Sequence, residues 1–386
     1  MHADGYVNWG HPHGSGEPLS FFRALILGGH TGVSLFLLLS GFLLSRPFLR
    51  EIAGGRRVER PWYFARRFWR IVPLYALAVV TTAVLTATDF TDLRRSLPYL
   101  CFLTPLIPSD QRLSPLLSGP WWSLSTEVQF YLLLPLLPLA LRSRKARAVG
   151  TGILALYAAA YVAFATNIAR VDLPTSYRLA HSLFGRAPLF GYGVLLAFLH
   201  QRRGARIRAW ATRTAWVRAG GADALLIATL LALGALVGST SAFTYPQLER
   251  FYPWWHVPEG ILWAVIMLLC LLAPLRCKTL LVNPILSRLG VLSYSIYLLH
   301  SPLFFHAYPT VLGGGRNGWD VAAVLATLAI GAVCVACATV TYRLIEQPMI
   351  QFGAQLRLVA GTASPTHGIE AIGGPTAGAE MTTHAA

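Results

Sequence analysis

Nine long apolar runs dominate this sequence of 386 residues. Each spans about 17–25 residues, which is enough for a helix to cross the hydrocarbon core of a bilayer. A membrane span must satisfy its own backbone hydrogen bonds, so the expected fold is all-α, a polytopic helical membrane protein. The predicted spans cover residues 29–48, 70–88, 121–141, 148–166, 183–200, 222–239, 259–275, 285–306 and 320–344.

The composition excludes most soluble classes of protein. Hydrophobic residues make up 55% of the chain and charged residues 12%, whereas soluble domains carry about 25% charged residues. An ordinary soluble enzyme, a nucleic-acid-binding protein and a disordered protein are therefore excluded. The cysteine count is five, an odd number that argues against a disulfide framework.

Basic residues gather in every other connection between the spans, within residues 50–67, 142–147, 202–218 and 276–278. Because loops rich in Lys and Arg stay in the cytoplasm, these four connections are expected to be cytoplasmic. The expected organisation is then an outer N-terminal segment over 1–28, a transmembrane domain over 29–350 and a disordered cytoplasmic tail over 351–386. An additional span upstream would restore a cytoplasmic N-terminus and make ten.

Ionisable residues inside spans are costly, so each is a functional candidate. Glu127 lies in the string GPWWSLSTEVQFYLLLPLL with Ser123 and Ser125. One interpretation is a carboxylate at the outer interface, paired with a loop arginine. The favoured interpretation is a buried acid or base.

Three arginines precede the second span, Arg66, Arg67 and Arg70. They anchor a helix at the cytoplasmic interface or form an anion site, because guanidinium groups bind phosphates in two-pronged geometry. An interfacial turn that leads into the span is the expected local structure.

The histidines indicate no metal site, since His2, His11, His13 and His30 follow no regular ligand spacing. His300 and His306 lie near the outer end of a span, where a structural role is favoured over catalysis. A serine nucleophile is weakly supported, because no GxSxG motif surrounds a serine. Walker and Rossmann glycine patterns are also missing from the sequence.

Five strings together resemble acyltransferase family 3, a family of membrane proteins, and they occur in the family's order. They are GVSLFLLLSGFLLSRPF (32–48), RRFWRIVPLY (66–75), WSLSTEVQFYLLLPLL (122–137), LGVLSYSIYLLHSPL (289–303) and RLIEQPM (343–349). The resemblance implies a ten-span protein that moves an acyl group, commonly acetyl from acetyl-CoA, to a hydroxyl of a carbohydrate or another small acceptor.

The resemblance also implies roles for particular residues. Arg67 and Arg70 match the pair that binds the acyl-CoA donor, and Glu127 matches the acid of the WSLSxE segment. The family's catalytic histidine maps to His2, with His11 and His13 as rivals. Ser34 departs from the family, which often has Asp there. Possible supporting residues are Ser34, Ser123, Ser125, Tyr294 and His300.

The sequence therefore predicts an integral membrane O-acyltransferase, multi-pass in the cell membrane with a cytoplasmic C-terminus. Acyl-CoA is the expected donor substrate, with no bound cofactor, and a hydroxylated saccharide or glycosylated natural product is the expected acceptor. His2 would act as base or transient acyl carrier, with Glu127 as its electrostatic partner. Two alternatives stay open: a transporter or flippase of a polar or lipid-linked molecule, and a degenerate member without catalysis. No nucleic-acid partner is expected.

Overall fold

A computed structural model describes residues 29, 31–87, 90–107, 119–239, 245–312 and 321–359. These residues form helices and connections without a strand. Within them, nine helical segments are long and apolar enough to cross a membrane, and each predicted span overlaps one of them. The prediction of an all-helical, polytopic membrane protein is confirmed.

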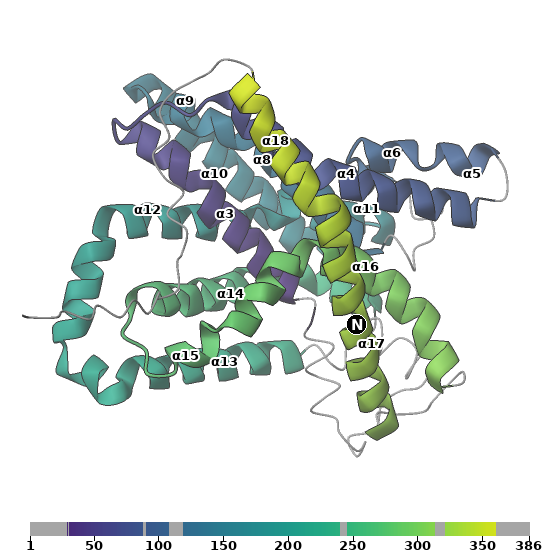
Figure 1. Ribbon diagram of the computed structural model, residues 1–386. Coiled ribbons are helices and arrows are strands. Elements are labelled where there is room, and N and C mark those ends of the chain that lie inside the picture. Colours follow the sequence, from purple (N-terminus) through teal and green to yellow (C-terminus); the bar gives the residue numbers. More distant parts are fainter. Residues whose placement is uncertain are drawn as a thin grey trace, which may run out of the picture.

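The long helices are labelled in Figure 1, and their colours follow their order in the sequence. They are α3 (Thr31–Ile52), α4 (Arg60–Thr86), α8 (Trp122–Leu133), α10 (Arg144–Asn167), α12 (Leu183–Arg213), α13 (Ala222–Gly238), α14 (Tyr245–Leu272), α16 (Pro284–Leu312), α17 (Val321–Thr341) and α18 (Gln347–Val359).

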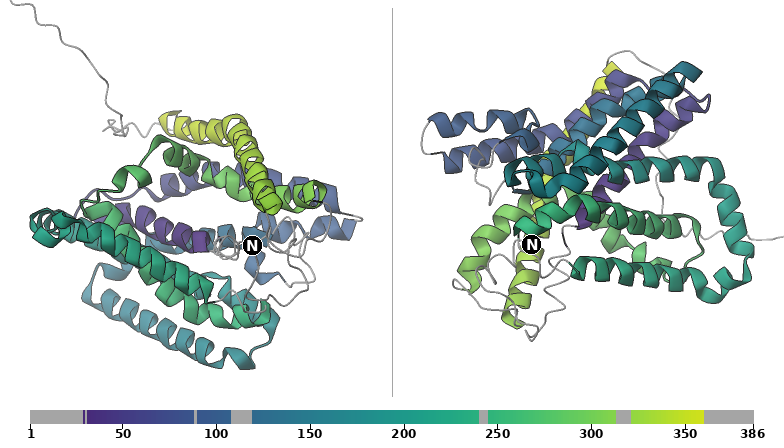
Figure 2. Two further views of the ribbon diagram at one scale, coloured as in Figure 1. Left: turned by 90° about the horizontal axis from the view of Figure 1, so that it is seen from below. Right: turned by 180° about the vertical axis from the view of Figure 1, so that it is seen from behind.

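Short helical segments connect or extend them. They are α5 (Phe90–Arg94), α6 (Leu97–Leu100), η2 (Thr104–Leu106), η4 (Gly119–Trp121), η5 (Leu134–Leu136), α9 (Leu137–Leu141), η6 (Ile168–Arg170), α11 (Leu173–Ala180), η7 (Val217–Gly221), α15 (Lys278–Leu281) and η8 (Tyr342–Glu346). Figures 1 and 2 show α5 and α6 beside the end of α4, projecting from one side of the molecule.

Helix α3 lies in the interior and packs along α12, α14 and α8. Its crossing with α12 depends on two glycines. A Cβ on Gly193 would collide with the carbonyl oxygen of Leu38, and one on Gly41 with the carbonyl oxygen of Phe190. Small residues let membrane helices approach this closely, so α3 and α12 touch backbone to backbone.

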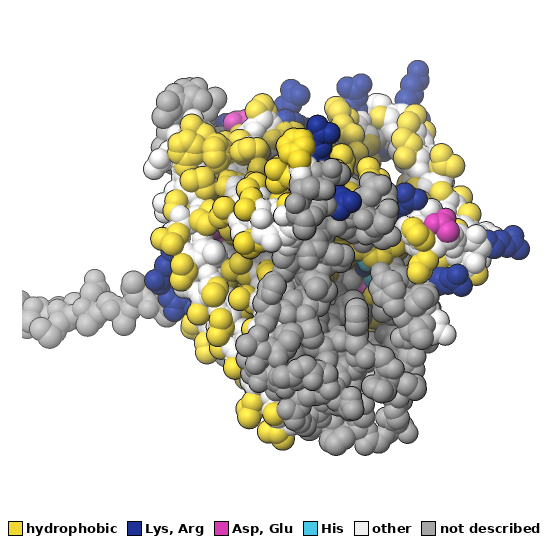
Figure 3. All heavy atoms as spheres, turned by 90° about the vertical axis from the view of Figure 1, so that its right-hand side faces the viewer, with side chains coloured by type: hydrophobic (Ala, Val, Ile, Leu, Met, Phe, Trp, Pro, Cys, Tyr) yellow, Lys and Arg dark blue, Asp and Glu magenta, His cyan; other side chains and the backbone are white. Residues whose placement is uncertain are grey.

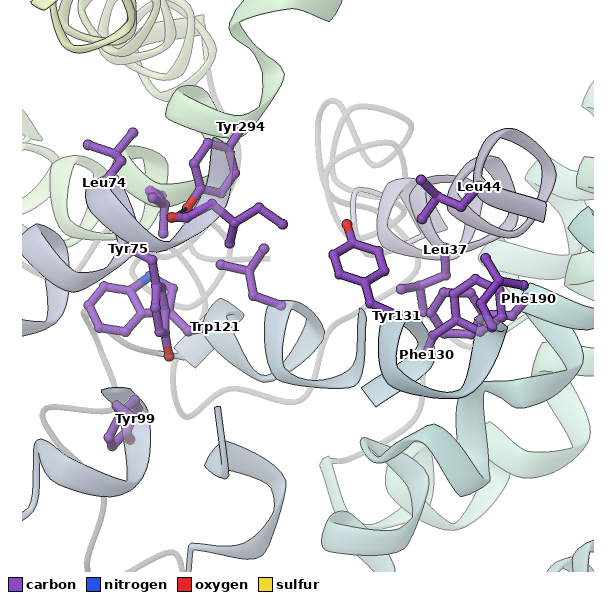
Figure 4. Close-up of a cluster of buried hydrophobic side chains, with 14 of the residues drawn as sticks. Leu37, Leu44, Leu74, Tyr75, Tyr99, Trp121, Phe130, Tyr131, Phe190 and Tyr294 are labelled. Carbon is purple, nitrogen blue, oxygen red and sulfur yellow. Dashed lines mark hydrogen bonds between the residues drawn. The ribbon is translucent and has the colours of Figure 1, made fainter. Parts of the chain in front are cut away.

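A core of buried side chains surrounds α8. In Figure 4 this helix runs from one group of them, with Tyr75, Tyr99 and Trp121 near its start, to a second group, with Phe130 and Phe190 near its end. The rings of Phe130 and Phe190 stack with centroids 4.2 Å apart. This packing fixes the rotation of α8 and therefore the direction in which its polar residues point.

The outer surface of the helices is apolar. In Figure 3 hydrophobic side chains cover much of the described surface, and Lys and Arg side chains stand at its edges. Leu85, Leu156 and Leu231 lie in predicted spans and are each more than two-thirds exposed (75%, 72% and 69%). Exposed leucines at this density suit contact with lipid rather than water.

Two helices begin ten or more residues before the apolar runs that predicted them. Helix α4 starts at Arg60, with a proline in its first turn where the missing N–H costs nothing, so the expected interfacial turn is wrong and Arg67 is helical. Helix α14 starts at Tyr245 and contains Pro253 and Pro258. Charge and proline lowered the hydropathy of these segments without ending the helix.

The C-terminal boundary also differs from expectation. Helix α18 runs to Val359, so the expected start of a disordered tail at residue 351 falls inside a helix. The remainder of that tail lies outside the described residues, as does the N-terminal segment 1–28.

Candidate functional site

Glu127 lies on α8 and is almost fully buried, with 4% of its surface exposed. The hydroxyl of Ser40, from α3, donates a hydrogen bond of 2.5 Å to Glu127 Oε1. The Tyr131 side chain, one turn further along α8, interacts with the same carboxylate. The carboxylate is therefore held from two helices.

Arg67 and Arg70 approach this carboxylate from α4, near enough for a favourable charge interaction. The guanidinium carbon of Arg67 lies 5.4 Å from the ring centroid of Tyr63 and 5.9 Å from that of Tyr131. Arg67 Nε is buried and has no hydrogen-bond acceptor among the described residues. We call Ser40, Arg67, Arg70, Glu127 and Tyr131 the Glu127 cluster.

A second carboxylate, Glu346, interacts electrostatically with Arg70. Glu346 is buried at the end of the π-helical turn η8 and accepts a hydrogen bond of 2.9 Å from Ser295 Oγ. Single π-helical turns occur frequently at functional sites. The sequence contained the signal for this residue in the string RLIEQPM, yet Glu346 was not among the predicted site residues.

A basic cavity opens at the junction of α3 and α4. Its volume is 580 Å³. It is lined by Pro47, Arg50, Ala53, Gly55, Arg56, Arg57, Val58, Glu59, Trp62, Arg66 and Gln201. Four arginines and a single carboxylate among these residues make a site suited to anions.

A third buried carboxylate, Glu259, lies on α14 and is fully buried. It accepts hydrogen bonds from Thr31 Oγ1 (2.5 Å) and from Ser34 Oγ (2.8 Å), both on α3. His256 Nδ1 lies 2.8 Å from Glu259 Oε2. A carboxylate therefore does adjoin position 34, where the resemblance expects Asp, but α14 supplies it.

Arg186 on α12 completes this second group. Its Nη1 lies 3.2 Å from His256 Nδ1, and its Nε donates to the carbonyl oxygen of Ala180 at 3.0 Å. The guanidinium carbon lies 4.6 Å from the ring centroid of Trp122 and 5.5 Å from that of Tyr252. We call Thr31, Ser34, Arg186, His256 and Glu259 the Glu259 cluster.

Arg186 lines a second cavity, of 250 Å³, which we call the aromatic cavity. The lining residues are Gly29, Val33, Gly119, Pro120, Trp122, His181, Arg186, Tyr252, Tyr297 and His300. The Tyr297 hydroxyl bonds to the carbonyl oxygen of Pro120 and lies 2.6 Å from Ser123 Oγ. Half of the ten lining residues carry an aromatic ring, namely Trp122, His181, Tyr252, Tyr297 and His300.

The predicted supporting residues divide between these places. Ser34 bonds to Glu259, Ser123 to Tyr297, and Ser125 to Thr104 at 2.8 Å. None of these three bonds reaches Glu127.

Two further predicted residues lie on α16. Tyr294 donates to the carbonyl oxygen of Ile71 at 2.6 Å, beside the Glu127 cluster. His300 lines the aromatic cavity, with Nδ1 2.7 Å from the carbonyl oxygen of Tyr297. His2, His11, His13 and His30 lie outside the described residues, as does the side chain of His306.

Sequence reasoning missed Arg186, His256 and Glu259. The predicted span began at residue 259, so the segment before it, with His256, was left outside the membrane helices. The available signal was the spacing of His256 and Glu259, which places both on one face of a helix. Ionisable residues on a membrane helix would then have marked the site.

The chain matches the acyltransferase domain of family 3 (Acyl_transf_3) over residues 1–343. It is 26% identical over 315 residues to BcsY of Komagataeibacter xylinus, named as a candidate membrane-bound transacylase, with 76% of this chain and 73% of that protein covered. It is 28% identical over 288 residues to ORF330 of Acidianus two-tailed virus, named as a candidate acetyltransferase, with 73% and 74% covered. No solved structure matches the chain. With the family match covering most of its length, the chain belongs to acyltransferase family 3 and is a membrane acyltransferase.

Proposed function

We propose that this acyltransferase moves an acyl group, acetyl in the simplest case, from acyl-CoA to a hydroxyl of a saccharide or glycosylated small molecule. The observation that carries the proposal is the Glu127 cluster, where two arginines face a buried carboxylate. Ionisable residues are costly to bury within a membrane protein, so they are retained where they bind a substrate or pair with one another.

The donor side of the proposal rests on the basic cavity. Acyl-CoA carries several phosphate charges, and Arg50, Arg56, Arg57 and Arg66 line this cavity. Arginine binds phosphate oxygens with paired N–H donors. Because CoA is cytoplasmic, the proposal places this cavity on the cytoplasmic side, in agreement with the positive-inside pattern. The membrane concerned would be the cell membrane, with the C-terminus also cytoplasmic.

The acyl end of the donor is assigned to the Glu127 cluster. Among the described residues, the Nε of Arg67 is a buried donor without an acceptor, which costs about 1–3 kcal/mol. A thioester carbonyl oxygen would accept from it and would bind more tightly as negative charge develops there.

The proposed reaction combines a proton transfer with the exchange of one bond at the acyl carbon. A histidine takes the proton of the acceptor hydroxyl, the hydroxyl oxygen bonds to the acyl carbon, and the carbon–sulfur bond breaks. The CoA thiolate leaves and takes the proton from the imidazolium. His2 is the proposed base or transient acyl carrier, and Glu127 is the proposed counter-charge for its imidazolium.

The test uses the purified protein in lipid nanodiscs with acetyl-CoA labelled in the acetyl group. Arg67→Ala with Arg70→Ala should lower acetyl-CoA consumption at least about a hundredfold, because two charge-assisted contacts are lost. Arg142→Ala with Arg144→Ala is the matched control, since both arginines are exposed on the chain around the start of α10.

If the two double variants consumed acetyl-CoA at the same rate, the assignment of Arg67 and Arg70 to the donor site would be wrong. A wild-type protein that consumes no acetyl-CoA with any saccharide, yet moves a lipid-linked sugar between vesicle leaflets, would favour transport instead.

A further inference from the structure

We propose that Arg186 is the acceptor-binding residue of the aromatic cavity, and that His256 and Glu259 are positioning residues that hold its guanidinium. The ligand class is an uncharged hydroxylated ring. The word acceptor rests on the proposed acyl transfer, whereas the ligand class rests on the cavity and its charges alone.

The first argument is the cost of the arrangement. Arg186, His256 and Glu259 are 4%, 1% and 0% exposed, and all three lie in membrane-length helices. Removing one partner of such a set leaves an uncompensated buried charge, which is strongly destabilising. A nonpolar set would hold α12 and α14 together without this penalty, so the charges point to a ligand that uses them.

The second argument is the charge balance. Glu259 accepts hydrogen bonds from Thr31 and Ser34 and faces His256, which lies beside Arg186, and buried charges in proteins are paired with an opposite charge. Arg186 keeps its positive charge at any physiological pH. One positive and one negative charge, with the His256 ring between them, make the cluster neutral overall.

A neutral cluster selects against charged ligands. Of the described residues that line the aromatic cavity, Arg186 alone carries a fixed charge, and Glu259 already balances it. A phosphate or carboxylate on the ligand would bring a second buried negative charge without a partner. Hydroxyl oxygens accept from a guanidinium without adding charge.

The third argument is the shape of the wall. Trp122 and Tyr252 flank the guanidinium of Arg186, and Tyr297 adds a further ring to the lining. Aromatic faces pack against the apolar faces of a small ring, while the arginine donates to its hydroxyl oxygens. The volume of 250 Å³ is below the roughly 300–1,000 Å³ of ordinary ligand pockets, so the cavity admits one ring.

His256 and Glu259 act on the ligand through Arg186. His256 Nδ1 lies 2.8 Å from Glu259 Oε2 and 3.2 Å from Arg186 Nη1. Because this nitrogen hydrogen-bonds to one of the two at a time, the charge attraction between Arg186 and Glu259 holds the other in place. Trp263 Nε1 donates to Thr31 Oγ1 at 2.8 Å and so orients one of the hydroxyls that bind Glu259. The guanidinium therefore keeps a fixed direction, as partners behind a binding group commonly ensure.

The test measures binding without the donor. The full-length protein in nanodiscs is titrated with a panel of methyl hexosides and with the matching methyl hexuronides, and contact is detected by saturation-transfer NMR. We expect wild type to bind at least one neutral hexoside and to bind its uronide at least tenfold more weakly.

Variants then assign the contact. Arg186→Gln should weaken hexoside binding about tenfold or more, because a hydrogen bond from a charged donor is lost. Arg178→Gln is the matched control, since Arg178 on α11 bonds to Thr175 instead. Glu259→Gln should also weaken binding, and it should raise the KM for the acceptor more than it lowers kcat.

The outcomes separate this inference from the proposed function. Hexoside binding that is lost in Arg186→Gln supports the inference even when no acetyl-CoA is consumed. Equal binding by Arg186→Gln and Arg178→Gln, tighter binding of the uronide, or no binding of any hexoside would overturn it. Monodisperse elution and an unchanged melting temperature confirm that the Arg186→Gln protein is folded. If it is not, Arg186→Lys serves instead, with the same expected loss of binding.

Discussion

The Glu127 cluster and the Glu259 cluster contain the same kinds of side chain, a carboxylate, a serine and an arginine, in different arrangements. Each contains a buried carboxylate that accepts a hydrogen bond from a serine of α3. In the first, two arginines of α4 lie near enough to Glu127 for a favourable charge interaction, and Arg70 is exposed. In the second, a buried histidine stands between Glu259 and a buried arginine.

This difference teaches how each cluster treats a ligand. Arg67 is partly exposed, and its Nε has no acceptor among the described residues. Such an arginine can donate a hydrogen bond to a substrate when it binds. An arginine that is fixed by a histidine and a carboxylate presents one rigid edge. The first arrangement suits a reacting group that changes charge, and the second suits the recognition of a fixed shape.

The largest expected effect comes from replacing each of the two carboxylates by an amide, one variant at a time. Glu127→Gln should lower kcat for acetyl transfer by about 10²–10³, the size of losing a group that stabilises developing charge. Glu259→Gln should act mainly through the acceptor KM. Both are measured by acetyl transfer at varied acceptor concentration. A kcat loss of the same size in both variants would erase the distinction drawn between the clusters.

The pH dependence sharpens the catalytic side of the comparison. If a neutral histidine is the base, the rate at saturating acceptor should rise with pH through about 6–7, since the ordinary imidazole pKa is about 6.5. Below that range the imidazolium cannot take the proton, so the rate falls about tenfold per pH unit. A rate that stays flat from pH 5 to 8 would contradict a histidine base.

A packing variant should impair both clusters equally. Gly193→Ala brings a Cβ against the backbone of α3, and overpacking of this kind costs about 1–3 kcal/mol. Thermal unfolding in detergent should show a lower melting temperature. Gly191→Ala on the same helix is the control, because no atom lies within 4 Å of its added Cβ. Equal melting temperatures for the two variants would mean that the α3–α12 contact is looser than described.

The smallest effect is expected at the start of α11, which precedes the aromatic cavity. Asp172 caps this helix, and hydrogen bonds from Thr175 hold the pKa of its carboxyl below the usual value. A lowered pKa stabilises the folded protein above the unfolded pKa of about 3.9, and the effect is lost as pH falls below it.

Asp172→Ala should therefore lower the melting temperature slightly at pH 7 and by less at pH 3. Acceptor binding should weaken slightly, while acetyl-CoA binding stays unchanged. A larger loss of melting temperature at pH 3 than at pH 7 would contradict the stabilisation of α11 by the ionised Asp172 carboxylate.

Much of the fold follows from the sequence because hydropathy measures the property that the bilayer selects. The nine spans were predictable for that reason, and the ends of the helices were not. Arg60 and Pro258 lower the apolar character of a segment without preventing a helix. Hydropathy therefore finds where lipid surrounds a helix rather than where the helix begins.

The short family strings made part of the site predictable, although Glu346 was missed within one of them, and the pairings between distant segments were hidden. Glu127 and Arg67 were identified in this way, and the structure places them together. Ser40 was not, because it lies 87 positions from its partner Glu127. Glu259 meets Ser34 across 225 positions, and such a pairing depends on how α3 and α14 pack.

One helix binds both carboxylates, and under the proposed function this sets the distance between the donor and the acceptor. Ser34 and Ser40 belong to α3 and are six positions apart, which is roughly 9 Å along a helix axis. The hydrocarbon core of a bilayer is about 30 Å thick. A group passed from the Glu127 cluster to the Glu259 cluster thus crosses about a third of that thickness. If the two clusters hold donor and acceptor as proposed, an acyl group has to reach across this distance and need not be transported across the whole bilayer.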